Sequence, residues 1–188
     1  MDRRVRRSRQ AIFSAFEGLL AKKRYEQITV GDIIERADVG RSTFYAHFET
    51  KDDLLRSTCD ELFHHVFEDH PAAEASHDFS GATATLPGML THILYHLRDD
   101  RDRYARIFSC ASADLFWASF KDHLASLVQS RGLPNAMCEQ GVPEDFFLDW
   151  YCSSFVEAVR WWFRTGLAST PEELEGFFET VTGTKMVR

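Results

Sequence analysis

The sequence predicts an all-α fold of about nine helices, with an N-terminal three-helix unit followed by a longer helical body. Apolar residues recur at three- and four-residue spacing along most of the chain, which is typical of helices that bury one face. Strand-like alternation is weak throughout. Thr29, Thr50 and Thr170 are each followed three residues later by an acidic residue, a pattern that marks a helix N-terminus.

The first two predicted helices are amphipathic. The first spans about 8–23 and carries one apolar stripe, formed by Ile12, Phe13, Phe16, Leu19 and Leu20. The second begins after Thr29, which is expected to cap it together with Asp32. Its buried side is expected to comprise Val30, Ile33, Ile34 and Ala37.

Seven more helices are predicted along the rest of the chain. One is short, at about 41–47, and the next runs from Thr50 to about Phe67. Residues 68–88 lack a sustained stripe and are expected to form a loop, and residues 132–143 are expected to be rich in turns. The remaining helices are predicted at about 87–97, 101–109, 113–131, 143–166 and from 171 onwards.

Composition excludes several classes of protein. With 44% hydrophobic and 13% aromatic residues, the chain can bury a core. It has no run of 18 apolar residues, so no membrane span is expected, and no secretion signal follows its basic start. The four cysteines are widely spaced, which indicates neither a zinc site nor a disulfide framework and favours a reducing cytoplasm as the location.

Charge is distributed unevenly along the chain. Residues 1–51 carry 11 basic and 7 acidic side chains, a net of +4, whereas residues 52–188 carry 11 and 22, a net of −11. A basic head on an acidic body is consistent with a polyanion that binds the head alone. Charge by itself favours no more than a soluble surface.

The stretch ITVGDIIERADVGRSTFYAHF combines a capped helix, a turn at ADVG and a second short helix. Two helices joined by such a turn form a helix-turn-helix, whose second helix lies in the major groove of DNA. Phe44 and Phe48 are four residues apart and are expected to anchor that helix to the core. Its other side chains are mostly polar and include Arg41, Ser42, Thr43, Tyr45 and His47.

These types of side chain suit DNA. Arginine pairs with the O6 and N7 atoms of guanine, and threonine offers a hydroxyl or a methyl group to base edges. Tyr45, His47 and Lys51 suit phosphate oxygens, and the N–H groups at the helix start near Thr29 suit another phosphate. The basic stretch RRVRRSR, residues 3–9, either contacts phosphates or a minor groove or is a disordered tail.

The segment TVGDIIERADVGRSTFYAHFETKDDLL resembles the N-terminal domain of tetracycline-repressor-like (TetR) transcriptional regulators. The matching positions, within residues 8–55, are Ala37, Val39, Thr43, Phe44, Tyr45, His47, Phe48, Lys51 and Leu54. The resemblance implies that the residues nearest the bases are Arg41, Ser42 and Thr43. The residues that it implies contact phosphates are Thr29, Tyr45, His47 and Lys51.

Two positions depart from the family pattern, and both lie in the turn. Asp38 replaces the usual Gly at the end of the second helix, where Asp tolerates a left-handed conformation better than most residues. Gly40 replaces the usual Ser cap of the third helix and is an adequate cap. We expect the turn to form with mild strain.

The predicted helix at 143–166 has two apolar rows. One comprises Phe147, Tyr151, Phe155, Ala158 and Trp162, and the other comprises Trp150, Ser154 and Trp161. One row is expected to face the core and the other a partner, with both rows internal as the alternative. The resemblance implies a homodimer through this helix and the helix from 171, so that two heads bind a palindromic operator with half-sites about 34–36 Å apart.

The resemblance also implies a pocket for a small-molecule effector, which we expect to be apolar or aromatic. The candidate lining residues are His92, Tyr95, His96, Phe116, Trp117, Phe120 and Trp150. Aromatic residues at such spacing are more often core. His92 and His96 share a helix face that could hold a metal, but no third ligand is evident, and we expect neither a metal nor another cofactor.

No catalytic motif of the G-x-S-x-G, Gly-rich phosphate-loop or H-E-x-x-H kind occurs, so we do not expect an enzyme. The sequence predicts a ligand-responsive homodimeric transcriptional regulator, most simply a repressor. Its DNA-binding domain is predicted at 1–50 and its ligand-binding and dimerisation domain at 51–188. The alternative is a cytoplasmic small-molecule-binding or scaffolding dimer whose DNA-binding head is not functional.

Overall fold

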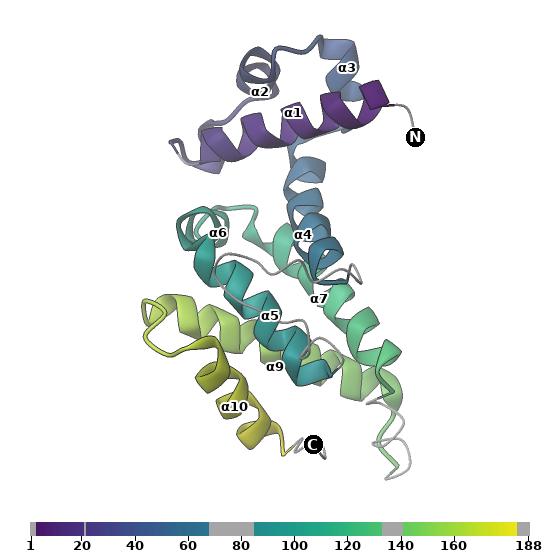
Figure 1. Cartoon of the computed structure of the whole chain (residues 1–188), viewed down its shortest axis with the longest axis vertical. Helices are drawn as coiled ribbons and strands as arrows, with labels where there is room; N and C mark the ends of the chain where they lie inside the picture. The colour runs from purple at the N-terminus through teal and green to yellow at the C-terminus, as the bar shows by residue number, and fades with distance from the viewer. Residues whose placement is uncertain (1–2, 21, 68–84, 133–140, 184–188) are drawn as a thin grey trace. The chain divides into compact units, whose positions relative to one another are not determined.

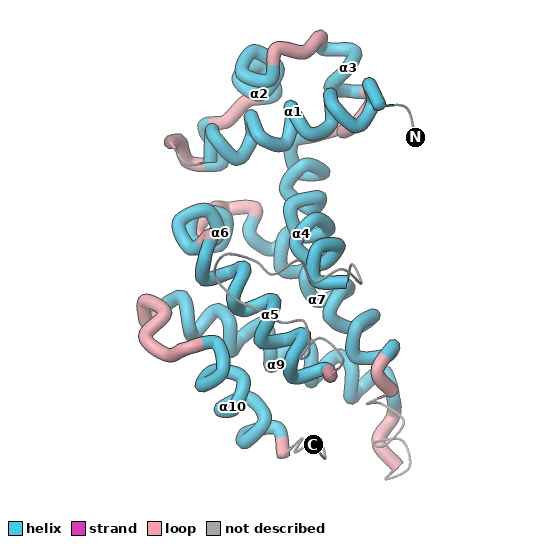
Figure 2. Tube along the Cα trace, viewed as in Figure 1, coloured by secondary structure: helices cyan, strands magenta, loops and turns pink. Residues whose placement is uncertain are grey.

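The computed structural model describes residues 3–20, 22–67, 85–132 and 141–183 (Figure 1). These residues form nine α-helices and one short 3₁₀ helix, and no strand occurs among them (Figure 2). The all-α prediction is therefore confirmed. Most of the predicted loop at 68–88 and most of the turn-rich stretch at 132–143 lie outside the described residues. A membrane-spanning segment is not found among the helices of the described part of the chain.

The described residues pack as two compact units. The first unit contains the residues up to Cys59 and residues 100–116, and the second contains residues 60–99 and those from Trp117 onwards. The helices of the first unit are α1 (Arg3–Leu20), η1 (Tyr25–Gln27), α2 (Val30–Ala37), α3 (Arg41–Tyr45), the first half of α4 (Lys51–Phe67) and α6 (Arg101–Phe108). Those of the second are the rest of α4, α5 (Leu86–Asp99), most of α7 (Ala113–Ser130), α9 (Glu144–Arg164) and α10 (Pro171–Thr182).

Helix α1 organises the first unit, because it packs against α2, α3 and α6. The apolar stripe predicted from its sequence is buried, and the Phe13 ring meets the Phe48 ring edge-on with centroids 6.1 Å apart. An ion pair of 2.8 Å between Arg103 and Glu17 joins α6 to α1. The first helix was predicted at about 8–23, whereas α1 begins earlier, at Arg3, and ends earlier, at Leu20.

Residues 3–9 form the first two turns of α1, so the interpretation as a disordered tail is wrong. The segment is held by contacts that its own sequence does not reveal. Ser8 Oγ lies 2.7 Å from His47 Nε2, and the Arg9 guanidinium lies over the Phe48 ring at 4.9 Å. These contacts join the start of α1 to the segment that follows α3.

Aromatic side chains fill the interior of the second unit. The Phe120 ring lies between Phe63 and Phe155, with centroids 5.0 and 6.4 Å away. Phe178 of α10 packs edge-on against Phe155 at 5.2 Å, and α10 also packs against α5. Pro171 follows the Thr170 cap, and the predicted capping box with Glu173 is present. The core therefore depends on contacts between α4, α7, α9 and α10.

Candidate nucleic-acid interface

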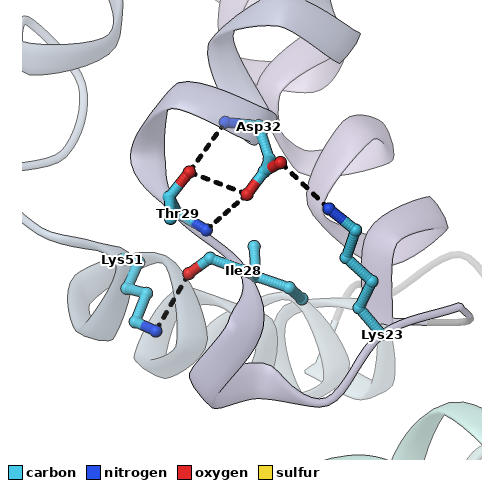
Figure 3. A network of polar contacts seen from close by, with 5 residues as sticks. All are labelled: Lys23, Ile28, Thr29, Asp32 and Lys51. Carbon is cyan, nitrogen blue, oxygen red and sulfur yellow. Dashed lines mark hydrogen bonds and ion pairs between the residues drawn. The ribbon is translucent and has the colours of Figure 1, made fainter.

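Short-range hydrogen bonds hold the start of α2 (Figure 3). Thr29 Oγ1 accepts from the Asp32 N–H at 3.1 Å and donates to Asp32 Oδ2 at 2.7 Å, and the Thr29 N–H donates to the same oxygen at 2.8 Å. These bonds to Thr29, helped by an ion pair of 3.0 Å with Lys23, hold the pKa of Asp32 well below its usual value. The predicted capping box is confirmed.

This arrangement leaves the first backbone donors of α2 for an outside acceptor. The first intrahelical bond runs from the Ile33 N–H to the Thr29 carbonyl at 3.2 Å. The N–H groups of Val30 and Gly31 come before it and have no acceptor within the helix. A helix start with such donors suits a phosphate oxygen. Because the Thr29 hydroxyl is bonded to Asp32, these backbone groups are the better donors at this end.

The turn between α2 and α3 has the backbone that the sequence predicted. Asp38 adopts a left-handed conformation with φ 52° and ψ 49°, and its N–H donates to the Glu35 carbonyl at 3.3 Å. A left-handed residue other than glycine costs roughly 1 kcal/mol. Gly40 is extended and caps α3 without a side-chain bond. The turn therefore carries mild strain at one residue.

Helix α3 separates its anchoring residues from its polar residues. Phe44 is fully buried and Phe48, just beyond the helix, is 3% exposed. Their ring centroids lie 5.9 Å apart. The polar flank of α3, which we define as Arg41, Ser42, Thr43 and Tyr45, is exposed except for the half-buried Thr43, and Tyr45 is 49% exposed. The Tyr45 ring meets the buried Phe44 ring edge-on with centroids 5.4 Å apart, but the flank as a whole stays open to solvent.

His47 lies half-buried at the edge of this flank. Its Nε2 atom is 2.7 Å from the Ser8 hydroxyl, which also lies 3.0 Å from the Val5 carbonyl. Burial, and secondly the charge of Arg9, lower the pKa of His47 below its usual value. The neutral ring is thus favoured near pH 7, and its contact with a phosphate would be a hydrogen bond rather than an ion pair.

Lys51 has partners that the sequence did not indicate. Its ammonium donates to the carbonyls of Tyr25 at 2.9 Å and Ile28 at 3.0 Å, and the latter bond appears in Figure 3. It also lies 4.2 Å from the centroid of the Tyr25 ring. The Tyr25 hydroxyl donates to Asp52, and burial followed by this bond raises the pKa of Tyr25. Lys51 therefore ties the η1 segment to the start of α4.

Sequence reasoning missed the residues that support the polar flank. Ser8 contacts His47, Lys23 pairs with the capping residue Asp32, and the Tyr25 carbonyl accepts from Lys51. Arg9 packs on the anchor Phe48, and Asp52 bonds the Tyr25 hydroxyl. The only local signal was the Thr29–Asp32 spacing. The other pairs join residues 9 to 39 positions apart, which no short-range pattern marks.

The predicted effector-binding residues lie in several surroundings. Phe116 packs in the first unit, 5.3 Å from Phe108, whereas the buried Trp117 and Phe120 belong to the second unit with centroids 5.8 Å apart. Trp150 is 42% exposed. The set is thus divided between the interior of both units and the surface.

The predicted histidine pair lies on α5. His92 Nε2 and His96 Nε2 are 2.9 Å apart, and His92 is buried. Tyr95 donates to Glu172 Oε1 of α10 at 2.5 Å. Within the described residues, no three His, Cys, Asp or Glu side chains are grouped as a metal site would require.

Helices α9 and α10 expose an apolar face. The inward row of α9 is largely buried, whereas Trp150 and Trp161 of the second row are 42% and 41% exposed. Phe177 and Val181 of α10 are 50% and 83% exposed. These four residues line a groove of about 530 Å³ with Leu174 and Phe178. The alternative that both rows are internal is wrong for this chain.

Comparison with known proteins bears on both parts of the chain. Residues 8–58 match the family model for bacterial regulatory proteins of the tetR family. Residues 84–182 match the family model for a transcriptional regulator C-terminal region. The chain is similar to a solved TetR transcriptional regulator from Streptococcus agalactiae 2603V, with 33% identity, 96% of each chain covered and a TM-score of 0.68. A solved dihydroxyacetone kinase operon activator DhaS, 20% identical over 93% of each chain, shares the fold with a TM-score of 0.58.

Two curated proteins match over shorter segments. The uncharacterized HTH-type transcriptional regulator YxbF of Bacillus subtilis (strain 168) is 39% identical over 71 residues, which is 35% of this chain and 19% of that protein. The HTH-type dhaKLM operon transcriptional activator DhaS of Lactococcus lactis subsp. lactis (strain IL1403) is 32% identical over 63 residues, 34% of each. The match thus covers about a fifth of the length of YxbF and about a third of the length of DhaS.

Proposed function

Because the chain belongs to the tetR family of bacterial transcriptional regulators, we propose that it is a homodimeric repressor that binds a palindromic operator. A small-molecule effector releases it from this DNA. The observation that carries the proposal is the exposed polar flank of α3, a helix that is anchored by the buried Phe44 and Phe48. Its place of action is the cytoplasm, and the proposal includes no catalytic step.

The DNA contacts follow from the side chains available. Arg41, Ser42 and Thr43 contact base edges in the major groove, where a guanidinium reads guanine through two bonds. Tyr45 and His47 hydrogen-bond phosphates, together with the N–H groups at the start of α2 near Thr29. Lys51 uses two of its three N–H groups on carbonyls, so one remains for a phosphate.

The exposed face of α9 and α10 supports the homodimer. Four large apolar side chains, Trp150, Trp161, Phe177 and Val181, lie in water in the single chain. Burial of such a face against its own copy removes apolar surface from water and places two α3 helices on one DNA duplex. We therefore assign residues 51–188 to dimerisation and effector binding and residues 1–50 to DNA binding.

The effector site is proposed for the aromatic interior between α5, α7 and α9. Helix α4 continues from the first unit into the second, so an effector that favours one arrangement of the second unit also acts on α4. Only a difference in affinity between the two arrangements can produce release.

The direction of regulation has a second candidate, activation, because DhaS of Lactococcus lactis is named as an activator. A reporter gene under the promoter beside this chain's own gene distinguishes the two directions. Expression falls when a repressor is supplied and rises when an activator is supplied. DNA binding itself is common to both.

A gel-shift assay tests the central proposal. The full chain is titrated against the promoter DNA beside its own gene at low salt, with an Arg41→Ala, Tyr45→Ala variant as the control. A shift that the variant loses, and that weakens steeply as salt rises, supports the regulator. Absence of any shift at low salt favours the alternative of a ligand-binding or scaffolding dimer with a non-functional head.

A further inference from the structure

A cavity of about 470 Å³ lies within the first unit, apart from the surfaces assigned to DNA, effector and dimer. Its walls come from residues 23–26, which include the start of η1, and from Arg106 and residues 109–111 at the end of α6. Cavities of this size hold small metabolites. The feature is therefore large enough to bind a ligand of its own.

The walls of this cavity are predominantly cationic. Lys23, Arg24 and Arg106 face one carboxylate, that of Glu26, which leaves a net charge of +2. Within the described residues, the guanidinium groups of Arg24 and Arg106 form no hydrogen bond or ion pair. Glu26 Oε1 already accepts from the Ala111 N–H at 2.6 Å, and this bond lowers the pKa of Glu26. Arg106 therefore has no acidic partner among the described residues, and Arg24 has only the charge attraction of Glu26, without a hydrogen bond or ion pair.

The remaining wall is neutral. Cys110 is half-buried, and desolvation raises the pKa of its thiol. Tyr25 is buried with its hydroxyl bonded to Asp52, and burial raises its pKa as well. Both groups are uncharged near pH 7. The cavity thus combines a neutral base with cationic edges, which suits a molecule with a compact body and anionic groups.

We propose that this cavity binds a small molecule with two or more anionic oxygens, such as a phosphorylated or polycarboxylate metabolite, through Arg24 and Arg106. A guanidinium donates two parallel hydrogen bonds to a phosphate or carboxylate, which gives orientation as well as attraction. The two arginines come from different elements, the segment before η1 and helix α6. A ligand held by both therefore joins these elements.

The cavity is linked to the start of α2 through Lys23. This residue lines the cavity and also pairs with Asp32, which caps α2, as Figure 3 shows. A bound anion competes with Asp32 for the same ammonium group. We therefore expect occupancy to change DNA affinity, a consequence that rests on the proposed function, whereas the binding site itself does not.

The thiol of Cys110 provides a direct measure of occupancy. The full chain is alkylated with N-ethylmaleimide at constant ionic strength in chloride, pyrophosphate or citrate, and labelling of Cys110 is followed by mass spectrometry. The buried Cys59 and Cys152 report any general unfolding. Saturable protection of Cys110, by threefold or more at millimolar anion, is the expected result. Protection by pyrophosphate alone indicates a phosphorylated ligand, and protection by citrate alone indicates a polycarboxylate.

Matched variants separate this site from general charge effects. The double variant Arg24→Gln, Arg106→Gln is expected to weaken anion binding about tenfold. Each substitution removes a charge-assisted hydrogen bond to the anion at an exposed site. Arg101→Gln, on the same helix but outside the cavity, should bind as the unaltered chain does. If circular dichroism shows that the double variant does not fold, Arg106→Gln alone replaces it in the binding test. Absence of protection by either anion, or equal protection in the double variant, overturns the proposal.

A DNA-binding measurement with the same anions at fixed ionic strength tests the link to α2. The affinity of the unaltered chain should change when the anion is present, and that of the double variant should not. If Cys110 is protected but DNA affinity stays constant, the link is overturned and the site stands. If the chain binds no DNA at all, the proposed function fails independently of the site.

Discussion

Helices α3 and α9 each bury aromatic residues on one side, but their exposed sides differ in chemistry. Helix α3 exposes Arg41, Ser42 and Tyr45, whereas α9 exposes Trp150 and Trp161. Water solvates the polar flank of α3 at little cost. Covering the aromatic face of α9 with a partner removes apolar surface from water, which lowers the free energy. One surface is therefore suited to a hydrated polyanion and the other to another apolar surface.

The two helices also differ in what keeps them folded. Helix α3 has five residues, too few to form in isolation, so its stability comes from Phe44 and Phe48. Helix α9 has 21 residues and packs along its length. Small changes to anchoring residues should thus affect α3 strongly, while changes on the exposed face of α9 and α10 should affect association.

The largest expected effect is on folding. Phe44→Ala removes a fully buried ring and should lower the free energy of unfolding by about 3–5 kcal/mol, with loss of DNA binding. Urea unfolding followed by circular dichroism measures the change. Phe146→Ala, at a residue of α9 that is 64% exposed and outside the α9–α10 groove, is the control and should cost less than about 1 kcal/mol. Equal losses would contradict the assignment of Phe44 as the anchor.

Association should respond to charge placed in the α9–α10 groove. Phe177→Glu puts a carboxylate among exposed apolar residues and should weaken the proposed dimer by at least about 2 kcal/mol, roughly thirtyfold. Sedimentation velocity over a range of concentrations measures the change. Thr180→Glu adds the same charge to an exposed residue of α10 outside the groove and should leave the dimer intact. Dissociation in both variants would place the dimer contact elsewhere.

Base recognition should depend on Arg41. Arg41→Ala should relax the preference at one base-pair position of each half-site by about 1–3 kcal/mol, because it removes the proposed paired contact with guanine. Binding to a library of operator variants measures this preference.

Lys51→Ala provides the contrast to Arg41→Ala. It should weaken binding to all sequences similarly, since a phosphate contact carries no base identity. It should also lower the stability of the first unit, because the carbonyls of Tyr25 and Ile28 lose their donor. A change confined to one base position in Lys51→Ala would show that the contacts were assigned wrongly.

The smallest expected effect is a pH dependence from His47. Its folded-state pKa is below the unfolded value of about 6.5, so its contribution to stability is present above that pH and is lost as pH falls through the folded-state pKa. The free energy of unfolding measured between pH 5 and 7.5 should therefore decrease on acidification, and less so in His47→Gln. A steeper decrease in the variant would reverse this assignment.

Much of the fold and the polar flank was predictable because the signals are local. Apolar residues three and four positions apart mark a helix face, and the capping pairs Thr29–Asp32 and Thr170–Glu173 join residues three apart. The same logic placed Phe44 and Phe48 inside and Arg41 and Tyr45 outside. Asp38 was correctly expected to adopt a left-handed turn.

Long-range partners required the folded chain. Lys51 bonds carbonyls 23 and 26 positions away, and His47 meets Ser8 across 39 positions. Nothing in the composition of these residues indicates such pairs, because the separation is bridged by the packing of α1 against α2 and α3. The helical start of α1 was missed for the same reason, since its support comes from α3 and the residues after it.

The linear order of residues thus settles which segments are helical and which side of each helix is apolar, since backbone hydrogen bonds and helical periodicity act within a few residues. Packing between helices settles which of two apolar rows on α9 is buried, which polar groups bond one another, and that Arg24 and Arg106 line the same cavity. These outcomes depend on distances between elements far apart in the chain, which are set only when the helices pack together.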